Sequence, residues 1–260
     1  MSGASKANGI GIRYLRTGGS KPPVVLLHGL TGSGDCWSPL ARALEDKYDV
    51  VMPDARGHGG SSTPPDGYRY ENLASDVVGL IEGLELVAPF LLGHSMGGMT
   101  AAVVANRMGT KLRGAILADP TFLSPERQRE VYASDVVEQH RRILCLKRDE
   151  VAAQLRARHP HRSPAIVELL AEGRLATRIE AFEILKPPNP EYRELMREIP
   201  VPVLLVIADG GVVSSETAQE LQKLNPRLRV ERIREAGHGL QFDQTNRFAE
   251  VVRAFLHSVA

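Results

Sequence analysis

The sequence is poor in several features that mark particular classes of protein. It contains only two cysteines, Cys36 and Cys145, in 260 residues, too few for a disulfide framework. Lys and Arg number 32 against 31 Asp and Glu, a formal net charge of +1, so no field of one sign gathers nucleic acid or an anionic membrane. No apolar run approaches the ~18 residues of a membrane span. We therefore expect neither nucleic acid nor membrane as a partner.

The N-terminal segment MSGASKANGI lacks the basic stretch followed by an apolar stretch that marks a secretion signal. Together with the low cysteine content, this predicts a cytoplasmic protein. A chain of this length can bury a large core, and α/β chains of this size commonly form one domain. We expect one domain with an insertion, as a monomer or homodimer.

Short runs rich in β-branched residues alternate with longer amphipathic segments. The expected strands are residues 10–15, 24–28, 49–53, 90–93, 112–118, 201–208 and 228–233, and the expected helices are residues 38–46, 71–85, 96–108, 216–224 and 246–256. The runs VVLL and VLLVI are apolar without alternation, which is typical of strands covered on both faces. The order of elements predicts an α/β fold with a doubly wound, mostly parallel sheet.

Residues 121–198 interrupt this alternation. They contain almost no strand-like run but many Glu, Arg, Ala and Leu residues, as in VAAQLR and IVELL. This composition predicts a helical insertion. The segment KPPNP, residues 186–190, closes its main part because consecutive prolines cannot continue a helix.

The stretch GHSMGG, residues 93–98, lies between an expected strand and an expected helix. Gly93-His94-Ser95-Met96-Gly97 matches the pattern G-x-S-x-G, in which a sharp turn presents a nucleophilic serine. The two glycines are needed because side chains there would collide with the neighbouring backbone. Ser95 is therefore the candidate nucleophile.

A serine hydroxyl needs a base, and His238 in the segment EAGHG is the best candidate. It follows the last expected strand, so it belongs to a loop at the carboxyl edge of the sheet, where Ser95 also lies. His28 and His94 are the other histidines beside glycine at a strand end, and we assign both to structural roles.

Four motifs occur in the order HGLTGSG at 28–34, DARGHGGS at 54–61, GHSMGG at 93–98 and AGH at 236–238. On these motifs the chain resembles the α/β-hydrolase superfamily over essentially its whole length. The resemblance implies that the backbone N–H groups of Leu30 and Met96 receive an oxyanion. It also implies a core of residues 1–120 and 199–260, with residues 121–198 as a helical cap over the pocket.

Two aspartates compete for the acid that orients His238. Many superfamily members carry the acid after the strand that ends near Ala208, but the segment ADGGVV is shortened and has glycine where that acid would fall, which leaves Asp209 as an alternative. Asp119 follows the preceding strand, and some members place the acid there. We prefer Asp119 because a carboxylate at that strand end can orient an imidazole.

Aromatic residues near the expected pocket suggest which groups contact the substrate. We expect Trp37, Phe122 and Phe182 to do so, although Trp37 also suits a core position. Apolar residues in the insertion favour an apolar acyl or lactone substrate. We predict no metal site, because His140, His159 and His161 lack ligand spacing.

The pattern is similar to bacterial carboxylesterases and lactonases, including types that degrade acyl-homoserine lactones. The resemblance thus implies a serine hydrolase that acts on a small-molecule ester or lactone through an acyl-enzyme and needs no cofactor. Two alternatives share the fold, a C–C bond hydrolase and a cofactor-free haloperoxidase. A small-molecule receptor with vestigial hydrolysis is a third alternative.

Overall fold

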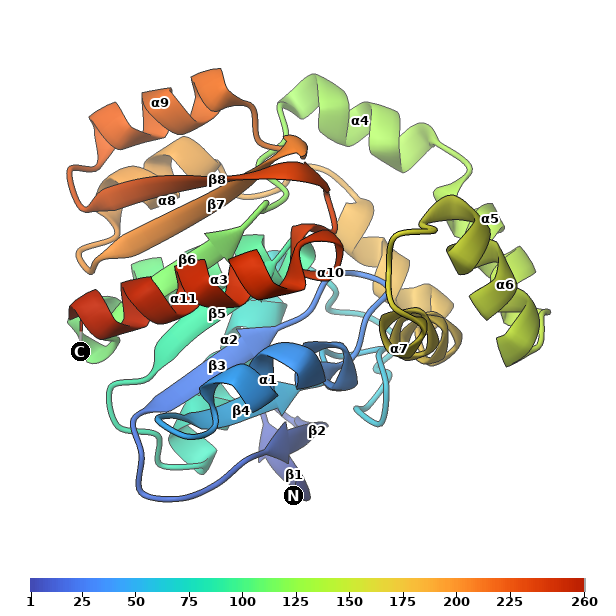
Figure 1. The fold of residues 1–260 in the computed structure, drawn as a ribbon, viewed down its shortest axis with the longest axis horizontal. Coiled ribbons are helices and arrows are strands. Elements are labelled where there is room, and N and C mark those ends of the chain that lie inside the picture. The colour runs from blue at the N-terminus through green and yellow to red at the C-terminus, as the bar shows by residue number, and fades with distance from the viewer. Residues whose placement is uncertain (260) are drawn as a thin grey trace.

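The sheet at the centre of the molecule has eight strands in the order β1-β2-β4-β3-β5-β6-β7-β8 (Figure 1). The computed structural model describes residues 1–259. The strands are β1 (Ser2–Ala7), β2 (Ile10–Arg16), β3 (Pro23–Leu27), β4 (Asp49–Pro53), β5 (Phe90–His94), β6 (Gly114–Ala118), β7 (Val203–Gly210) and β8 (Leu228–Gly237). Strands β4, β3, β5, β6, β7 and β8 run parallel, whereas β1 and β2 pair antiparallel at one edge. The mostly parallel α/β fold expected from the sequence is confirmed.

All seven expected strands are present, but β1 was not predicted. Residues 2–6 alternate between exposed and half-buried positions, and Ala7 is buried. The sequence SGASKA carries no β-branched residue. Pairing with β2, rather than any intrinsic preference, makes it a strand.

Helices cover both faces of the sheet. They are α1 (Ser38–Leu44), α2 (Tyr70–Gly83), α3 (Met96–Met108), α9 (Ser215–Leu224), α10 (Leu240–Asp243) and α11 (Thr245–Val259), with 3-10 turns η1 (Gly34–Trp37) and η2 (Gly109–Lys111). Figure 1 shows α1 and α11 in front of the sheet, with α2 and α3 behind it. Along β3, Val25 and Leu27 pack in the core that contains α2 and α3, while Val24 and Leu26 pack in the core that contains α1 and α11. Burial on both faces explains why this strand shows no alternation of apolar and polar residues.

The segment between β6 and β7 is helical, as expected from its composition. It contains α4 (Pro125–Ala133), α5 (Val136–Leu144), α6 (Arg148–Arg158), α7 (Pro164–Leu175), the 3-10 segment η3 (Ile179–Leu185) and α8 (Tyr192–Glu198). Helices α6 and α7 share a small apolar cluster of their own, whereas Tyr192 and Met196 of α8 pack in the main core with α3. Within residues 1–259, helices α4 to α7 thus contribute no residue to the two cores on the sheet, whereas α8 and Ile184 of η3 belong to the layer that covers it.

None of the helices in the described chain, residues 1–259, is both long and apolar enough to cross a membrane.

Candidate active site

Ser95 occupies the sharp turn between β5 and α3. Its backbone has φ 56° and ψ −118°, a left-handed conformation that is costly for a residue with a side chain. Its carbonyl accepts hydrogen bonds from the amides of Gly98 and Met99 at 2.9 and 3.1 Å, and its own amide donates to the carbonyl of Ala118 at 3.1 Å. These contacts hold the turn in its strained form.

Gly93 and Gly97 leave space for this turn. A Cβ at Gly93 would lie 2.0 Å from the carbonyl oxygen of Gly97, and a Cβ at Gly97 would lie 2.2 Å from the carbonyl oxygen of Leu27. Both obstacles are backbone atoms in the core and cannot move aside as a flexible side chain could. The spacing of the motif therefore follows from close backbone packing.

We expect Gly97→Ala to lower the free energy of unfolding by at least about 1–3 kcal/mol, the usual cost of overpacking a core. Urea unfolding of the variant and the parent protein measures the difference. Gly210→Ala is the matched control, because a Cβ there would meet nothing closer than 3.5 Å. Equal losses in the two variants would contradict the steric explanation.

Ser95, His238 and Asp119 form one chain of hydrogen bonds. The Ser95 Oγ lies 2.9 Å from His238 Nε2, and His238 Nδ1 lies 2.6 Å from Asp119 Oδ2. Because the carboxylate can only accept, Nδ1 carries the proton and Nε2 is free to accept the hydrogen of the serine hydroxyl. Ser95 is 8% exposed and Asp119 is 0% exposed, so the chain runs from a buried carboxylate to the edge of a pocket.

Asp119 is held from several sides. It has φ 41° just after β6, and its amide donates to the carbonyl of Val206 at 2.8 Å. The Val212 amide donates to both carboxylate oxygens at 2.9 and 2.8 Å, and the Val213 amide donates to Oδ1 at 3.0 Å. The turn after β7 thus wraps around this carboxylate and stabilises its charge.

Asp209, the alternative acid, makes no hydrogen bond to His238 among residues 1–259. It accepts hydrogen bonds from Arg232 Nε at 2.7 Å and from the Glu235 amide at 2.9 Å, and the Glu235 amide followed by Arg232 lowers its pKa. A Cβ at Gly211, in the turn after β7, would lie 2.7 Å from Asp119 Oδ1. The Asp119 carboxylate fills the space beside this glycine.

His94 contacts the backbone of the loop that carries His238. Burial and the neighbouring His238 ring lower the pKa of His94 to about 3, so its ring is neutral. Its Nε2 donates to the carbonyl of His238 at 2.7 Å. This contact is compatible with the structural role expected for His94, which stays a prediction.

The amides of Leu30 and Met96 are free to donate to a ligand. Within residues 1–259 neither N–H group has a protein acceptor. The carbonyl of Gly29 accepts from His28 Nδ1 at 2.8 Å and from the Gly32 amide at 2.9 Å. Because a trans peptide directs its C=O and N–H to opposite sides, the N–H of Leu30 points away from those donors. Leu30 lines the same pocket as Ser95, and Met96 follows Ser95 at the first turn of α3.

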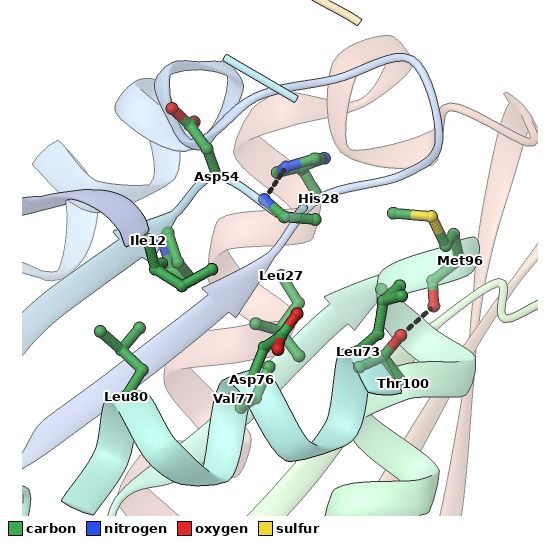
Figure 2. Close-up of a pocket in the computed structure, with 13 residues that line it drawn as sticks. Ile12, Leu27, His28, Asp54, Leu73, Asp76, Val77, Leu80, Met96 and Thr100 are labelled. Carbon is green, nitrogen blue, oxygen red and sulfur yellow. Dashed lines mark hydrogen bonds between the residues drawn. The ribbon is translucent and has the colours of Figure 1, made fainter. Parts of the chain in front are cut away.

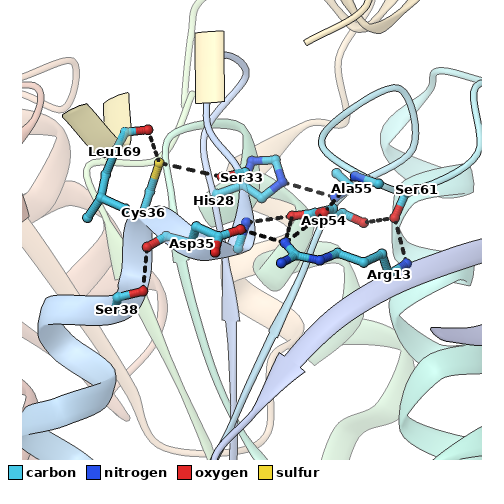
Figure 3. Close-up of polar contacts among 12 residues, drawn as sticks. Arg13, His28, Ser33, Asp35, Cys36, Ser38, Asp54, Ala55, Ser61 and Leu169 are labelled. Atoms are coloured by element: carbon cyan, nitrogen blue, oxygen red, sulfur yellow. Dashed lines mark hydrogen bonds and ion pairs between the residues drawn. The ribbon is translucent and has the colours of Figure 1, made fainter. Parts of the chain in front are cut away.

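A buried polar network fixes the loop that carries Leu30 (Figure 3). Asp54 is fully buried and accepts from the Gly34 amide at 2.7 Å and from Arg13 Nη1 at 3.1 Å. The Ala55 amide donates to His28 Nε2 at 2.9 Å, which leaves the proton of His28 on Nδ1. The HGLTGSG and DARGHGGS motifs are therefore held together by these hydrogen bonds.

The pocket in front of Ser95 has a volume of about 210 Å³. It is lined by His28, Gly29, Leu30, Thr31, Gly32, Cys36, Trp37, His94, Ser95, Leu170, His238, Gln241 and Phe242. Of the aromatic residues expected to contact substrate, Trp37 lies in this wall, whereas Phe122 and Phe182 do not. Phe122 stacks on Tyr192 at 4.8 Å in the core, and Phe182 packs on His140 at 4.6 Å, because the interior of the molecule offers these rings more apolar contact than the cleft does.

Three residues of the pocket wall were missed by the sequence analysis. Gln241 and Phe242 lie in α10, which begins two residues after His238, and this closeness in sequence is a signal that could have found them. Leu170 comes from α7 in the insertion. No local pattern distinguishes it from its neighbours.

A second cavity, of about 30 Å³, lies between the sheet and α2, beside Met96 at the start of α3 (Figure 2). Its wall includes Leu27, Leu73, Val77, Met96 and Thr100. This volume suits a water molecule or two but not an organic substrate. The pocket in front of Ser95 is therefore the candidate substrate site.

The structure brings together three potential metal ligands that their sequence positions did not reveal. One ligand atom each from His159, His161 and Asp243 lies within 4.8 Å of the others. Arg162 Nε donates to Asp243 Oδ1 at 2.7 Å, so a guanidinium already neutralises the carboxylate. The absence of a metal site stays a prediction.

Comparison with known proteins agrees with this architecture. The family profile described as the alpha/beta hydrolase fold matches residues 22–245. N-formylmaleamate deformylase of Pseudomonas putida is 29% identical over 98% of the chain and 96% of its own length. The sn-1-specific diacylglycerol lipase of Xenopus laevis is 30% identical over 91% of the chain and 80% of its own length. A solved esterase from Exiguobacterium antarcticum, 24% identical, superposes with a TM-score of 0.82 over 99% of this chain and 100% of that one, a likeness of fold.

Proposed function

The chain belongs to the α/β-hydrolase family, and from this we propose that it is a serine hydrolase that cleaves carboxylic esters or lactones through an acyl-enzyme. The observation that carries the proposal is the hydrogen-bond chain from Ser95 through His238 to Asp119. A lipase that is 30% identical over most of the chain supports ester hydrolysis. No cofactor enters the proposed reaction.

In the acylation step, His238 Nε2 takes the proton of Ser95 as Oγ bonds to the substrate carbonyl carbon. The carbonyl electron pair moves to oxygen, and the amides of Leu30 and Met96 donate to this oxyanion. The intermediate then expels the alkoxide, which takes the proton from His238. Asp119 holds the ring in the required tautomer and stabilises its positive form.

Deacylation repeats these steps with water as the nucleophile. His238 removes a proton from water, the hydroxide attacks the acyl carbon, and the second tetrahedral intermediate releases the carboxylic acid while Ser95 Oγ regains its proton. In a lactone the leaving alkoxide stays attached to the acyl group, so the product is a single hydroxy acid.

The proposed substrate is small and has an apolar acyl group. The pocket volume of about 210 Å³ lies below the range of about 300–1,000 Å³ that is usual for drug-sized ligands. Its walls include Leu30, Trp37, Leu170 and Phe242. Leu170 comes from residues 121–198, and we propose that this segment caps the pocket.

We expect a fluorophosphonate to form a covalent adduct on Ser95, detected by mass spectrometry of the digested protein. We also expect p-nitrophenyl acetate and butyrate to be hydrolysed with higher kcat/KM than the octanoate, because the pocket limits the acyl length. A panel with a lactone, an N-formyl amide and a vinylogous diketone tests the bond that is cleaved.

Each outcome of this panel discriminates between functions. Turnover of esters or lactones supports the proposal, whereas faster cleavage of the diketone favours the C–C hydrolase. Faster cleavage of the formyl amide favours a reaction like that named for the deformylase. An adduct without turnover of any substrate favours a receptor, and the absence of an adduct on Ser95 rejects the nucleophile.

A further inference from the structure

The loop that carries His238 is fixed by an ion pair with the insertion. Asp243 lies at the end of α10, and its Oδ2 accepts from the amide of Gly237 at 2.9 Å. Gly237 immediately precedes His238, so this bond sets the backbone on the N-terminal side of the base. The carbonyl of His238 is held by His94 at 2.7 Å, and Asp243 thus supplies the second anchor.

Arg162, in the connection between α6 and α7, holds Asp243 in turn. Its Nε donates to Asp243 Oδ1 at 2.7 Å, and the side chains of Arg162 and Asp243 are only 8% and 5% exposed. Burial pushes the pKa of Asp243 upward, but the bonds from Arg162, His161 and Gly237 outweigh this and lower it. A buried charge pair with these bonds has a narrowly defined geometry.

The Arg162 guanidinium also lies against the pocket wall. Its carbon is 5.6 Å from the centre of the Phe242 ring, and a Cβ at Gly239 would lie 2.5 Å from Nη2. Phe242 lines the pocket in front of Ser95. One arginine from the insertion therefore touches the chain on the C-terminal side of His238, close to the substrate site.

We propose that Arg162 and Asp243 are positioning residues, which couple the insertion to His238 and keep Nε2 in line with Ser95. This inference rests on the proposed function, because it assumes that His238 activates Ser95. His161 Nε2 lies 3.0 Å from Asp243 Oδ1, but its side chain is 52% exposed. Arg162, which is buried, is the principal partner.

The experiment compares Arg162→Ala, Arg162→Lys and Asp243→Asn in the full chain. Four quantities are measured. They are the second-order rate of Ser95 labelling by a fluorophosphonate, kcat per folded protein and KM for p-nitrophenyl acetate, and the midpoint of thermal unfolding. We expect Arg162→Ala to lower the labelling rate and kcat by about 10²-fold, the effect of misplacing a reacting group by about 1 Å. Asp243→Asn should act in the same direction, and Arg162→Lys should recover part of the rate because it keeps a charged donor.

Arg148→Ala is the matched control. Arg148 bridges α6 to Glu172 of α7 at 2.7 Å with both side chains about half exposed, and it has no contact with the His238 loop among the described residues. Its variant should keep the labelling rate of the parent protein. If Arg162→Ala does not fold, Arg162→Lys and Asp243→Asn decide the question.

Two results overturn the inference. In the first, the variants keep the parent labelling rate and kcat per folded site, so the pair serves stability alone. In the second, Arg148→Ala lowers the rate as much as Arg162→Ala. Failure of the proposed function looks different, since it shows in the parent protein itself: Ser95 is then not labelled, or it is labelled while no ester or lactone is hydrolysed.

Discussion

Ser95→Ala is expected to lower kcat for ester hydrolysis by about 10⁴-fold or more, because losses of triad members in serine hydrolases reach this size. Alanine removes the only atom that can form the acyl-enzyme. It leaves the free amides of Leu30 and Met96 and the pocket wall in place, so KM should change much less than kcat. The fold should persist, because the Ser95 side chain has His238 as its hydrogen-bond partner and no role in capping α3.

The measurement is steady-state hydrolysis of p-nitrophenyl acetate, with the adduct on residue 95 followed in parallel. Ser134→Ala is the control, since it removes a hydroxyl from an exposed position at the end of α4 that bonds only to a backbone carbonyl. The variant at 95 should show neither turnover nor adduct. Activity above a few per cent of the parent value would reject Ser95 as the nucleophile.

Asp119→Asn is expected to cost about 10⁴-fold in kcat, the size of the effect when an asparagine replaces a triad aspartate. The reason can be derived from the contacts of the carboxylate. Oδ1 accepts from the amides of Val212 and Val213, whereas Oδ2 accepts from Val212 alone, so we expect the asparagine carbonyl at the Oδ1 position and its NH₂ group toward His238. His238 Nδ1 would then accept a hydrogen bond, the ring proton would move to Nε2, and Nε2 could no longer accept the proton of Ser95.

Asp209→Asn, assayed beside it, separates the two candidate acids. Asp209 bonds to Arg232 and to the Glu235 amide on the exposed side of β8, so its variant should keep the parent kcat. The unfolding midpoints of both variants show whether a loss reflects folding. A larger fall in kcat for Asp209→Asn would return the role to Asp209, and small equal losses would leave both aspartates structural.

The sequence predicted most of the sheet because buried parallel strands have a strong local signature. Residues 24–27 are apolar throughout, and the structure shows why, since alternate residues enter different cores. Strand β1 escaped prediction because small and polar residues form it only by pairing with β2. The residues of β1 do not themselves indicate a strand, because this segment becomes one through its pairing with β2.

Residues of the site could be predicted where they belong to a local sequence motif. They were harder to predict where tertiary packing determines their contacts. The structure brings Ser95 and His238 together as the motifs predicted, but the preference for Asp119 depended on how the turn after β7 folds. That turn wraps around the Asp119 carboxylate, a contact between positions more than ninety residues apart. Phe122 and Phe182 fit a cleft or a core equally well by sequence, and only the packed structure separates these environments.

The pairing of β5 with β6 has a mechanical consequence for the proposed triad. The strands are in register up to His94 and Ala118, and the backbones beyond them remain joined, since the Ser95 amide bonds to Ala118 and the Thr121 amide to Ser95. Ser95 and Asp119 therefore follow two strands that are hydrogen-bonded to each other to their ends. We expect the separation between these two residues to stay nearly constant during thermal motion. We therefore expect a fluctuation that interrupts proton transfer to arise at His238, which lies on a separate loop.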